Sequence, residues 1–249
     1  MDSRKILEIY KLINDRSIKP VNAWPSIADI PQGALVRDAD GVVKQNRFVF
    51  YNAGADWVNC KRPSWLSQIR PGIDSFFIDV VYLISSYSSI GRVYSLEGLN
   101  GAETQFSLIP TTNSATTYTR IGGTGTTNIG EVPINTFVKH TLAGKVPSST
   151  SQSILNDSAP VTIINGGTFV STNNLILGGY SFDTNTQNME GAIAYFAIRD
   201  GAGNLIDVLD FNKWNGSSSI SFRSGHSCSV SDGVPTGARK LALVPVSML

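Results

Sequence analysis

The feature that most constrains this chain is a succession of short strand-like segments separated by turns. Beyond residue 46, runs enriched in Val, Ile, Leu, Phe, Tyr and Thr alternate with stretches of Gly, Asn, Ser, Thr and Pro, the residues typical of turns. No helical periodicity lies between them. The pattern predicts an all-β fold, an antiparallel β-sandwich or jelly roll. The expected strands are 47–51, 73–84, 92–96, 104–109, 116–121, 136–143, 161–165, 174–180, 191–199, 204–211, 219–222 and 241–246.

Three segments predict more than a bare strand. Residues 34–43 read as a hairpin around the Asp40-Gly41 turn. Residues 191–199 are apolar on both faces, which suits a central strand of a two-sheet core. Residues 136–143 alternate strictly, so Val138, His140 and Leu142 should face one way and Phe137, Lys139 and Thr141 the other.

One helix is expected at the start of the chain, over residues 3–18, with Ser3 as its N-cap and Pro20 beyond its end. Two uses of this helix stay open: it docks on its own domain, or it attaches the chain to a neighbouring subunit. Residues 20–34, with Trp24 and Ile27, read as an ordered connector whose apolar side chains need burial. The apolar stripe of the helix, and hence its oligomerisation or attachment face, consists of Ile6, Ile9, Tyr10 and Ile13.

Composition excludes several classes of protein. Lys plus Arg number 20 and Asp plus Glu 19, so no basic excess points to nucleic acid. With 41% hydrophobic residues and little net charge, the chain should not be disordered. It has no apolar run long enough for a transmembrane helix, which excludes membrane insertion, and Glu8 and Lys11 interrupt any signal-peptide core. We therefore expect it to be made and kept in a cytoplasm, at least until an assembly or lysis event.

The two cysteines, Cys60 and Cys228, and two histidines, His140 and His226, do not have the spacing of a zinc site. Two reduced, partly buried thiols are expected, with a disulfide between the ends of the domain as the alternative.

Several strand motifs carry a resemblance to a known family. Leu175-Ile176-Leu177-Gly178 leads through a polar loop to Gly191–Asp200, and a turn and the strand 204–211 follow. Residues 136–142 and 73–80 match earlier strands of the same pattern. Residues 47–212 thereby resemble the concanavalin A-like lectin/glucanase domains of the laminin-G type, versions of which occur in tailed-bacteriophage virion proteins and in surface proteins of gut bacteria. The N-terminal helix and the tail after Trp214 lie outside the resemblance. We expect two parts: residues 1–34, an attachment or oligomerisation segment, and residues 35–249, a lectin-like β-sandwich.

Catalytic motifs of the glucanase branch are missing. That branch carries three carboxylates in an acid-x-acid-x-x-acid strand, and retaining hydrolysis needs two carboxyl groups about 5–5.5 Å apart. Here Asp74 and Asp79 fall on opposite faces of a regular strand, as do Asp207 and Asp210. We expect these to be strand-edge or solvent-facing acids and the protein not to be an enzyme.

Two surface constellations are candidates for binding. The loop 181–190 offers four oxygen ligands for calcium: Asp183, Asn185, Asn188 and Glu190. An Asx-rich turn is the alternative explanation of these residues, and no cofactor other than calcium is expected. A glycan would need exposed aromatic rings beside amides, for which the loop-flanking candidates are Tyr118, Tyr180, Phe182, Asn173 and Asn185.

Three functional hypotheses follow. The first is a non-enzymatic structural protein of a bacteriophage virion (a fibre, decoration or receptor-binding subunit), forming a homotrimer, contacting other virion proteins through its helix and binding a host surface glycan. The alternative is a carbohydrate-binding module of a bacterial or viral surface protein. A glycan-degrading enzyme of the same fold is the third.

Overall fold

A computed structural model describes residues 17–54, 56–70, 73–86, 91–96, 106–110, 116–121, 127–144, 150–164, 173–179, 188–231 and 238–249. The helix predicted over residues 3–18 falls almost entirely on residues 1–16, outside this described part. Ile6, Ile9, Tyr10 and Ile13 lie outside it as well, so the helix and the domain boundary after residue 34 stay predictions.

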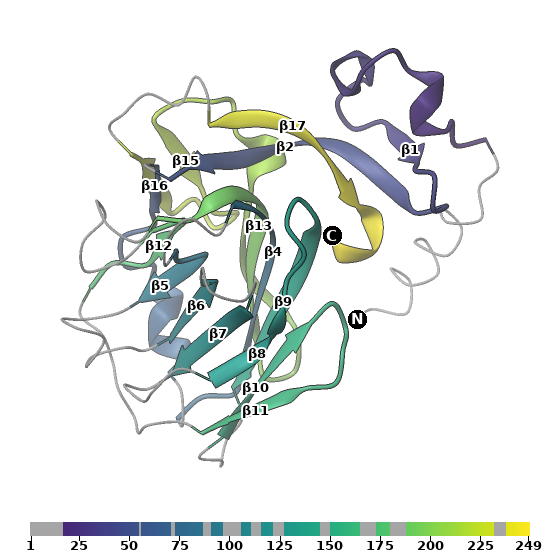
Figure 1. Ribbon diagram of the computed structural model, residues 1–249. Helices are drawn as coiled ribbons and strands as arrows, with labels where there is room; N and C mark the ends of the chain where they lie inside the picture. Colours follow the sequence, from purple (N-terminus) through teal and green to yellow (C-terminus); the bar gives the residue numbers. More distant parts are fainter. Residues whose placement is uncertain are drawn as a thin grey trace.

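Two antiparallel sheets make up the fold (Figure 1). The nine-stranded sheet has the order β1 (Leu35–Arg37), β2 (Val43–Ala53), β13 (Glu190–Asp200), β4 (Phe76–Ser86), β9 (Phe137–Gly144), β10 (Thr150–Leu155) and β11 (Val161–Ile164), with β14 (Leu205–Asp210) paired to β13 and β17 (Arg239–Pro245) paired to β2. The eight-stranded sheet has the order β15 (Ser219–Ser221), β16 (Ser227–Val230), β3 (Val58–Asn59), β12 (Ile176–Leu177), β5 (Tyr94–Leu96), β6 (Phe106–Pro110), β7 (Thr116–Ile121) and β8 (Thr127–Glu131).

The helices of the described residues are short 3-10 turns: η1 (Val21–Ala23), η2 (Ile27–Asp29), η3 (Ser64–Gln68), η5 (Phe211–Lys213) and η6 (Val246–Met248). No helix among the described residues is long and apolar enough to span a membrane.

The predicted all-β antiparallel sandwich is confirmed, and each expected strand overlaps an observed one. The hairpin at residues 34–43 is also confirmed, since β1 pairs with β2 around Gly41, which has a φ of 80°. Strands β3, β8, β10 and β16 were not predicted. Each is short or rich in Ser, Thr and Asn, and the strand period is hidden when small polar side chains such as Ser151 and Ser153 face the interior.

Apolar side chains from both sheets fill the space between them, among them Val80, Tyr82, Phe196 and Trp214. The alternation predicted for residues 136–143 holds, because Val138 and Leu142 belong to this core. His140, on the same face, is completely buried there.

The opposite face of the nine-stranded sheet, which we call the outer face, has a smaller apolar cluster of its own. It contains Val49, Val81, Phe137, Ala192, Ala194 and Val244. Met248 and Leu249 pack against it, so the end of the chain lies on this face. Two apolar layers explain why β13 is apolar on both sides, as its sequence predicted for a central strand.

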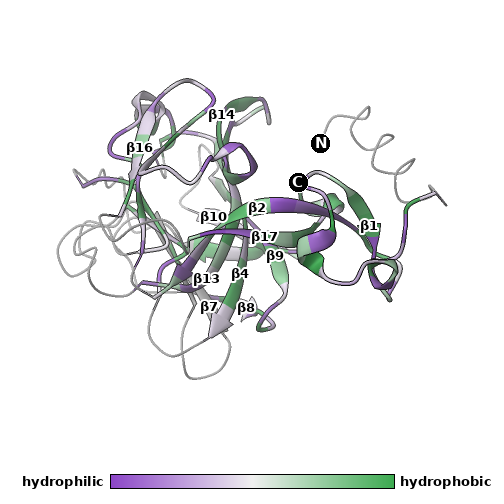
Figure 2. Ribbon diagram, turned by 90° about the horizontal axis from the view of Figure 1, so that it is seen from above, coloured by the Kyte–Doolittle hydropathy of each residue, from purple (hydrophilic) through white to green (hydrophobic). Residues whose placement is uncertain are grey.

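The strand β1 and the adjoining ends of β2 and β17 project from the sandwich to one side (Figures 1 and 2). The connector before β1 is ordered into η1 and η2, but it buries less than its sequence predicted. Ile30 is buried, whereas Trp24 is half-buried with Lys19 above its ring and Ile27 remains 47% exposed. Among the described residues, these turns stand beside the extension formed by β1 and the ends of β2 and β17, away from the two-sheet core (Figure 1).

A candidate sugar-binding pocket on the outer face

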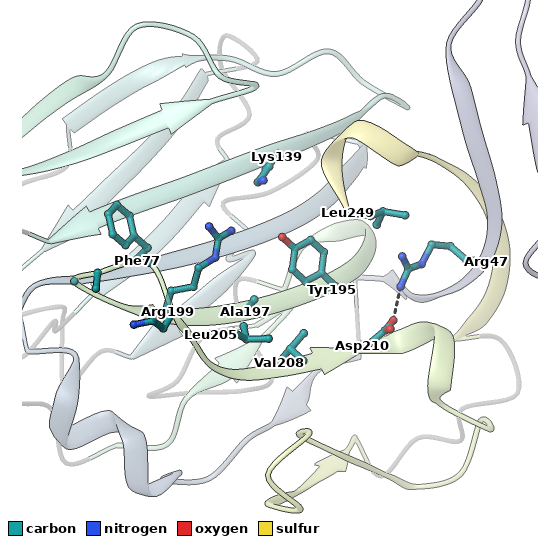
Figure 3. Close-up of a pocket in the computed structure, with 14 residues that line it drawn as sticks. Arg47, Phe77, Lys139, Tyr195, Ala197, Arg199, Leu205, Val208, Asp210 and Leu249 are labelled. Carbon is teal, nitrogen blue, oxygen red and sulfur yellow. Dashed lines mark hydrogen bonds and ion pairs between the residues drawn. The ribbon is translucent and has the colours of Figure 1, made fainter. Parts of the chain in front are cut away.

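A pocket of about 1030 Å³ lies on the outer face, over four adjacent strands: β9, β4, β13 and β14 (Figure 3). Strand register fixes its floor as three rows of cross-strand neighbours. The first row is Lys139, Val81, Tyr195 and Asp210; the second is Thr141, Asp79, Ala197 and Val208; the third is Ala143, Phe77, Arg199 and Leu205. With strands about 4.8 Å apart and same-face residues about 6.8 Å apart, this floor measures about 14 by 14 Å.

The pocket is hollow because its middle row is short. Ala197 and Val208 stand between the longer Tyr195 on one side and Arg199 on the other. Arg47 of β2, Leu249 and the turn 201–204 between β13 and β14 complete the lining. The lining therefore combines apolar surface with an aromatic ring and charged groups, and the aromatic and charged side chains lie on strands of one sheet.

A β-bulge in β13 brings Tyr195 to this face. Ile193 pairs with Tyr82 of β4 and Tyr195 already pairs with Val81, so Ala194 is the extra residue. Ala194 and Tyr195 consequently both face outward, while Ile193 and Phe196 face the core. In an unbroken strand Tyr195 would point to the same side as Ile193, into the core.

Two of the three cations in the pocket are paired with carboxylates. Arg199 donates to Asp79, whose other oxygen accepts a hydrogen bond from the Thr141 hydroxyl at 2.6 Å. Arg47 donates to Asp210, but its Nε is buried without a hydrogen-bond partner. Burial lowers the pKa of Arg47, and Asp210 opposes that shift.

The remaining cation, Lys139, is only 8% exposed, and among the described residues its ammonium has no ion pair or hydrogen bond. The hydroxyl of Tyr195, two strands away in the same row, is protonated at neutral pH, because burial and the nearby Asp79 raise the pKa of Tyr195 above its usual value.

Two aspartates that were predicted to lie at a strand edge or in solvent are buried. Asp79 was expected at a strand edge or in solvent, but it is 1% exposed beneath the pocket. Asp207 is completely buried and accepts hydrogen bonds from the Trp65 indole at 3.1 Å and the Ser224 hydroxyl at 2.6 Å. The prediction failed because each acid has a dedicated donor from a distant part of the chain, which offsets the cost of burying its charge.

Asp79 and Asp210 are the two acids nearest the hollow. They lie two strands and one row apart, about 12 Å at the backbone by sheet spacing. Each carboxylate is paired with an arginine, Asp79 with Arg199 and Asp210 with Arg47.

None of the predicted glycan residues with a described side chain lines this pocket. Asn173 precedes β12 in the other sheet, and its carbonyl accepts from Arg62 at 2.6 Å. Tyr118 belongs to β7 of that sheet, but its side chain lies outside the described part, as do Tyr180, Phe182 and Asn185.

The calcium prediction falls partly on described residues. Asp183 and Asn185 lie outside them. Asn188 is buried with an Oδ1 that lacks a hydrogen-bond partner, and Glu190 begins β13. Within the described residues no cluster of three or more His, Cys, Asp or Glu side chains could hold a metal.

Sequence reasoning missed the residues that form the pocket: Arg47, Lys139, Tyr195, Arg199 and Asp210. One signal was available for Lys139, because the alternation of residues 136–143 places it on the face opposite His140. The others depend on strand pairing across the sheet, which the local pattern does not contain.

Comparison with known proteins adds the fold relationship. No family model matches the chain, and no curated protein sequence matches it. A candidate carbohydrate-binding protein from Bacteroides ovatus superposes with a TM-score of 0.61 at 10% identity, over 82% of this chain and 62% of that one. This chain therefore spans about three fifths of the length of that structure.

Two further structures are more distant. The CBM40 domain of Ruminococcus gnavus IT-sialidase bound to α2,3-sialyllactose gives a TM-score of 0.48 at 17% identity, over 61% of this chain and 88% of that one. Domains LG4-5 of the mouse laminin α1 chain give 0.45 at 13% identity, over 70% and 46%. The Bacteroides ovatus match shows the fold alone: the chain has the antiparallel β-sandwich fold of that structure.

Proposed function

We propose that this protein is a non-catalytic carbohydrate-binding domain that takes a glycan into the outer-face pocket. The observation that carries the proposal is the hollow between Tyr195 and Arg199 above Ala197 and Val208. A sugar ring presents apolar C–H faces and polar hydroxyl edges, so it needs apolar or aromatic walls together with fixed hydrogen-bonding groups. The pocket supplies both, on strands that hold them rigidly.

Two facts support this choice over the first hypothesis. A pocket of about 1030 Å³ is at the upper end of the usual range for small-ligand sites, about 300–1,000 Å³, and has room for a short oligosaccharide. The Bacteroides ovatus neighbour, itself a candidate carbohydrate-binding protein, has the same fold.

Filling the hollow tests the proposal. Val208 is half-buried and points into the pocket, so Val208→Trp should occupy the sugar's place without breaking an ion pair. The matched control is Ser221→Trp, at an exposed position of β15 in the other sheet. On a glycan array we expect signal from the parent and the control and none from Val208→Trp. Equal signal from all three would place glycan binding elsewhere, and an array without any hit would refute the function.

Absence of catalysis is part of the same proposal. Asp79 is held by Arg199 and Thr141, so we assign it a structural role. Incubation with capsular and plant polysaccharides should release no reducing ends. Release that Asp79→Asn abolishes would establish the glycan-degrading hypothesis instead.

The virion hypothesis rests on composition, the predicted helix and the phage versions of the resembled family. It places the chain in a particle as a homotrimer that contacts other virion proteins through residues 3–18. Light scattering of the full chain and of a chain lacking residues 1–19 tests it. A trimer that becomes a monomer on truncation supports the role of the helix, whereas an unchanged mass contradicts it.

Calcium at residues 183–190 is a separate proposal. It predicts that calcium raises the melting temperature of the parent and that Asn188→Ala and Glu190→Gln abolish the rise. An identical melting temperature with calcium and with a chelator would contradict it.

A further inference from the structure

The charge of Lys139 has no partner in the part of the chain that the structure describes. It lies on β9 at the first row of the pocket floor, with Val81 and then Tyr195 beside it. Among the described residues no carboxylate is within ion-pair distance of its ammonium, and no hydrogen bond reaches it. Only 8% of the Lys139 residue is exposed, and a cation that lines a pocket without a partner makes an anion there favourable.

The other charges of the pocket compensate one another. Arg47 is paired with Asp210, and Arg199 with Asp79. Lys139 is therefore the cation of the lining that no described carboxylate pairs, and the α-carboxylate of Leu249, which also lines the pocket, is not within ion-pair distance of it.

Hydrogen-bonding capacity points the same way. The ammonium of Lys139 and the guanidinium groups of Arg47 and Arg199 are donors only, and the Tyr195 hydroxyl carries a proton. The two carboxylates already accept hydrogen bonds from the arginines. The charged side chains thus offer unused donors in excess of acceptors, which suits a ligand group that only accepts, as an ionised carboxylate does.

We propose that the glycan bound in this pocket carries a carboxylate, as a uronic or other acidic sugar does, and that Lys139 forms the ion pair with it. This inference rests on the proposed carbohydrate-binding function. Tyr195 lies in the same row, two strands from Lys139, and its hydroxyl is a further donor for a ligand that spans the row. Arg47, whose Nε is unpartnered, flanks the opposite side of Tyr195 (Figure 3).

The test uses acidic glycans and their methyl esters, which keep the sugar's shape and remove its charge. Oligogalacturonate, oligoglucuronate and N-acetylneuraminic acid-terminated oligosaccharides, each with its ester and a sulfated neutral glycan, are titrated by calorimetry. The full chain should bind at least one free acid tenfold or more tightly than its ester.

Three variants assign the effect to Lys139. Lys139→Met should lower affinity for the acid to that for the ester, whereas Lys139→Arg keeps the charge and should stay within a few-fold of the parent. Lys61→Met, an exposed lysine beside β3 of the other sheet, removes the same charge outside the pocket and should match the parent. Since Lys139 has no partner among the described residues, Lys139→Met should melt no lower than the parent.

The outcomes separate the two proposals. Equal affinity for acids and esters, with Val208→Trp abolishing both, overturns the carboxylate assignment and keeps the carbohydrate-binding function. Preference for the sulfated glycan over every carboxylated one also overturns it. Absence of binding to any glycan overturns both proposals.

Discussion

Cys60 and Cys228 lie directly opposite each other on neighbouring antiparallel strands. Strand β3 pairs Val58 with Val230 and Asn59 with Ser229, and the next step of that register joins the two cysteines. Ser231 donates to Trp57 at 2.9 Å, whereas the Cys60 amide donates away, to Leu175 at 2.8 Å. The cysteines therefore form a non-hydrogen-bonded pair, in which the Cα atoms approach to about 4.5 Å, near the lower limit for a disulfide.

Oxidation of this pair is the first prediction. Both thiols are free and buried, more completely than the partial burial expected from sequence. Burial and the neighbouring Cys228 raise the pKa of Cys60, so the pair should react slowly while the chain is folded. A thiol oxidant such as diamide should nevertheless take up the two thiol hydrogens and join Cys60 to Cys228 by a disulfide within one chain. The loss of two hydrogens is observable by mass spectrometry. Cys60→Ser should block the change, and a dimer in place of the intramolecular bond would contradict the register.

The second prediction is a pH dependence that originates at His140. Burial lowers the pKa of His140 from 6.5 to about 3, and its ring contacts the Ser153 hydroxyl at 2.5 Å and the Tyr94 hydroxyl at 3.4 Å. Below pH 6.5 the unfolded chain binds a proton that the folded chain does not. Stability is thus fully present above pH 6.5 and is lost as the pH falls toward 3, by up to about 1.4 kcal/mol per unit.

Comparison with His140→Gln isolates this contribution, since glutamine keeps hydrogen-bonding groups but does not titrate. Urea unfolding at pH 7, 6, 5 and 4 should show a steeper loss in the parent than in the variant. Parallel curves would mean that His140 is not the group responsible.

The third prediction concerns the ion pair beneath the pocket. Arg199→Leu leaves the buried carboxylate of Asp79 without its counter-charge and should cost about 3–5 kcal/mol in the free energy of unfolding. Adding Asp79→Leu should recover a large part of that loss, because the pair is then replaced by apolar groups. Denaturant titration of the two single variants and the double variant gives the coupling. Additive losses would show that the two side chains do not interact.

The fourth prediction tests the junction of β13 with β4. Gly191 has a φ of 155°, and a Cβ there would lie 1.9 Å from the Leu83 carbonyl oxygen. Gly191→Ala should therefore force the strands apart and cost several kcal/mol. Gly203, with a φ of 86° and no atom within 4 Å of its Cβ position, is the matched control. Its Ala variant should show only the backbone cost, about 1–2 kcal/mol, and equal losses at both positions would contradict the steric argument.

The sequence predicted strands with a regular pattern of apolar residues better than strands whose buried residues are polar. The apolar face of residues 136–143 and the two-sided run at 191–199 were read correctly, since burial imposes a period that side chains display. Strand β10 escaped because its buried positions include Ser151 and Ser153, whose polarity conceals the period. Asp79 and Asp207 were wrongly predicted to be exposed for a different reason: the donors that make their burial possible come from residues remote in sequence.

Local periodicity was enough to predict the all-β character of the chain and the sides on which regular strands place their residues. Which strands are neighbours became known only from the folded chain. That neighbourhood places Lys139 beside Val81 and Tyr195, and Cys60 opposite Cys228. The pairing of β13 with β4 also includes the bulge at Ala194, which turns Tyr195 outward. Pairing and bulges depend on contacts between segments far apart in the chain, and a pocket built from them has no local signature.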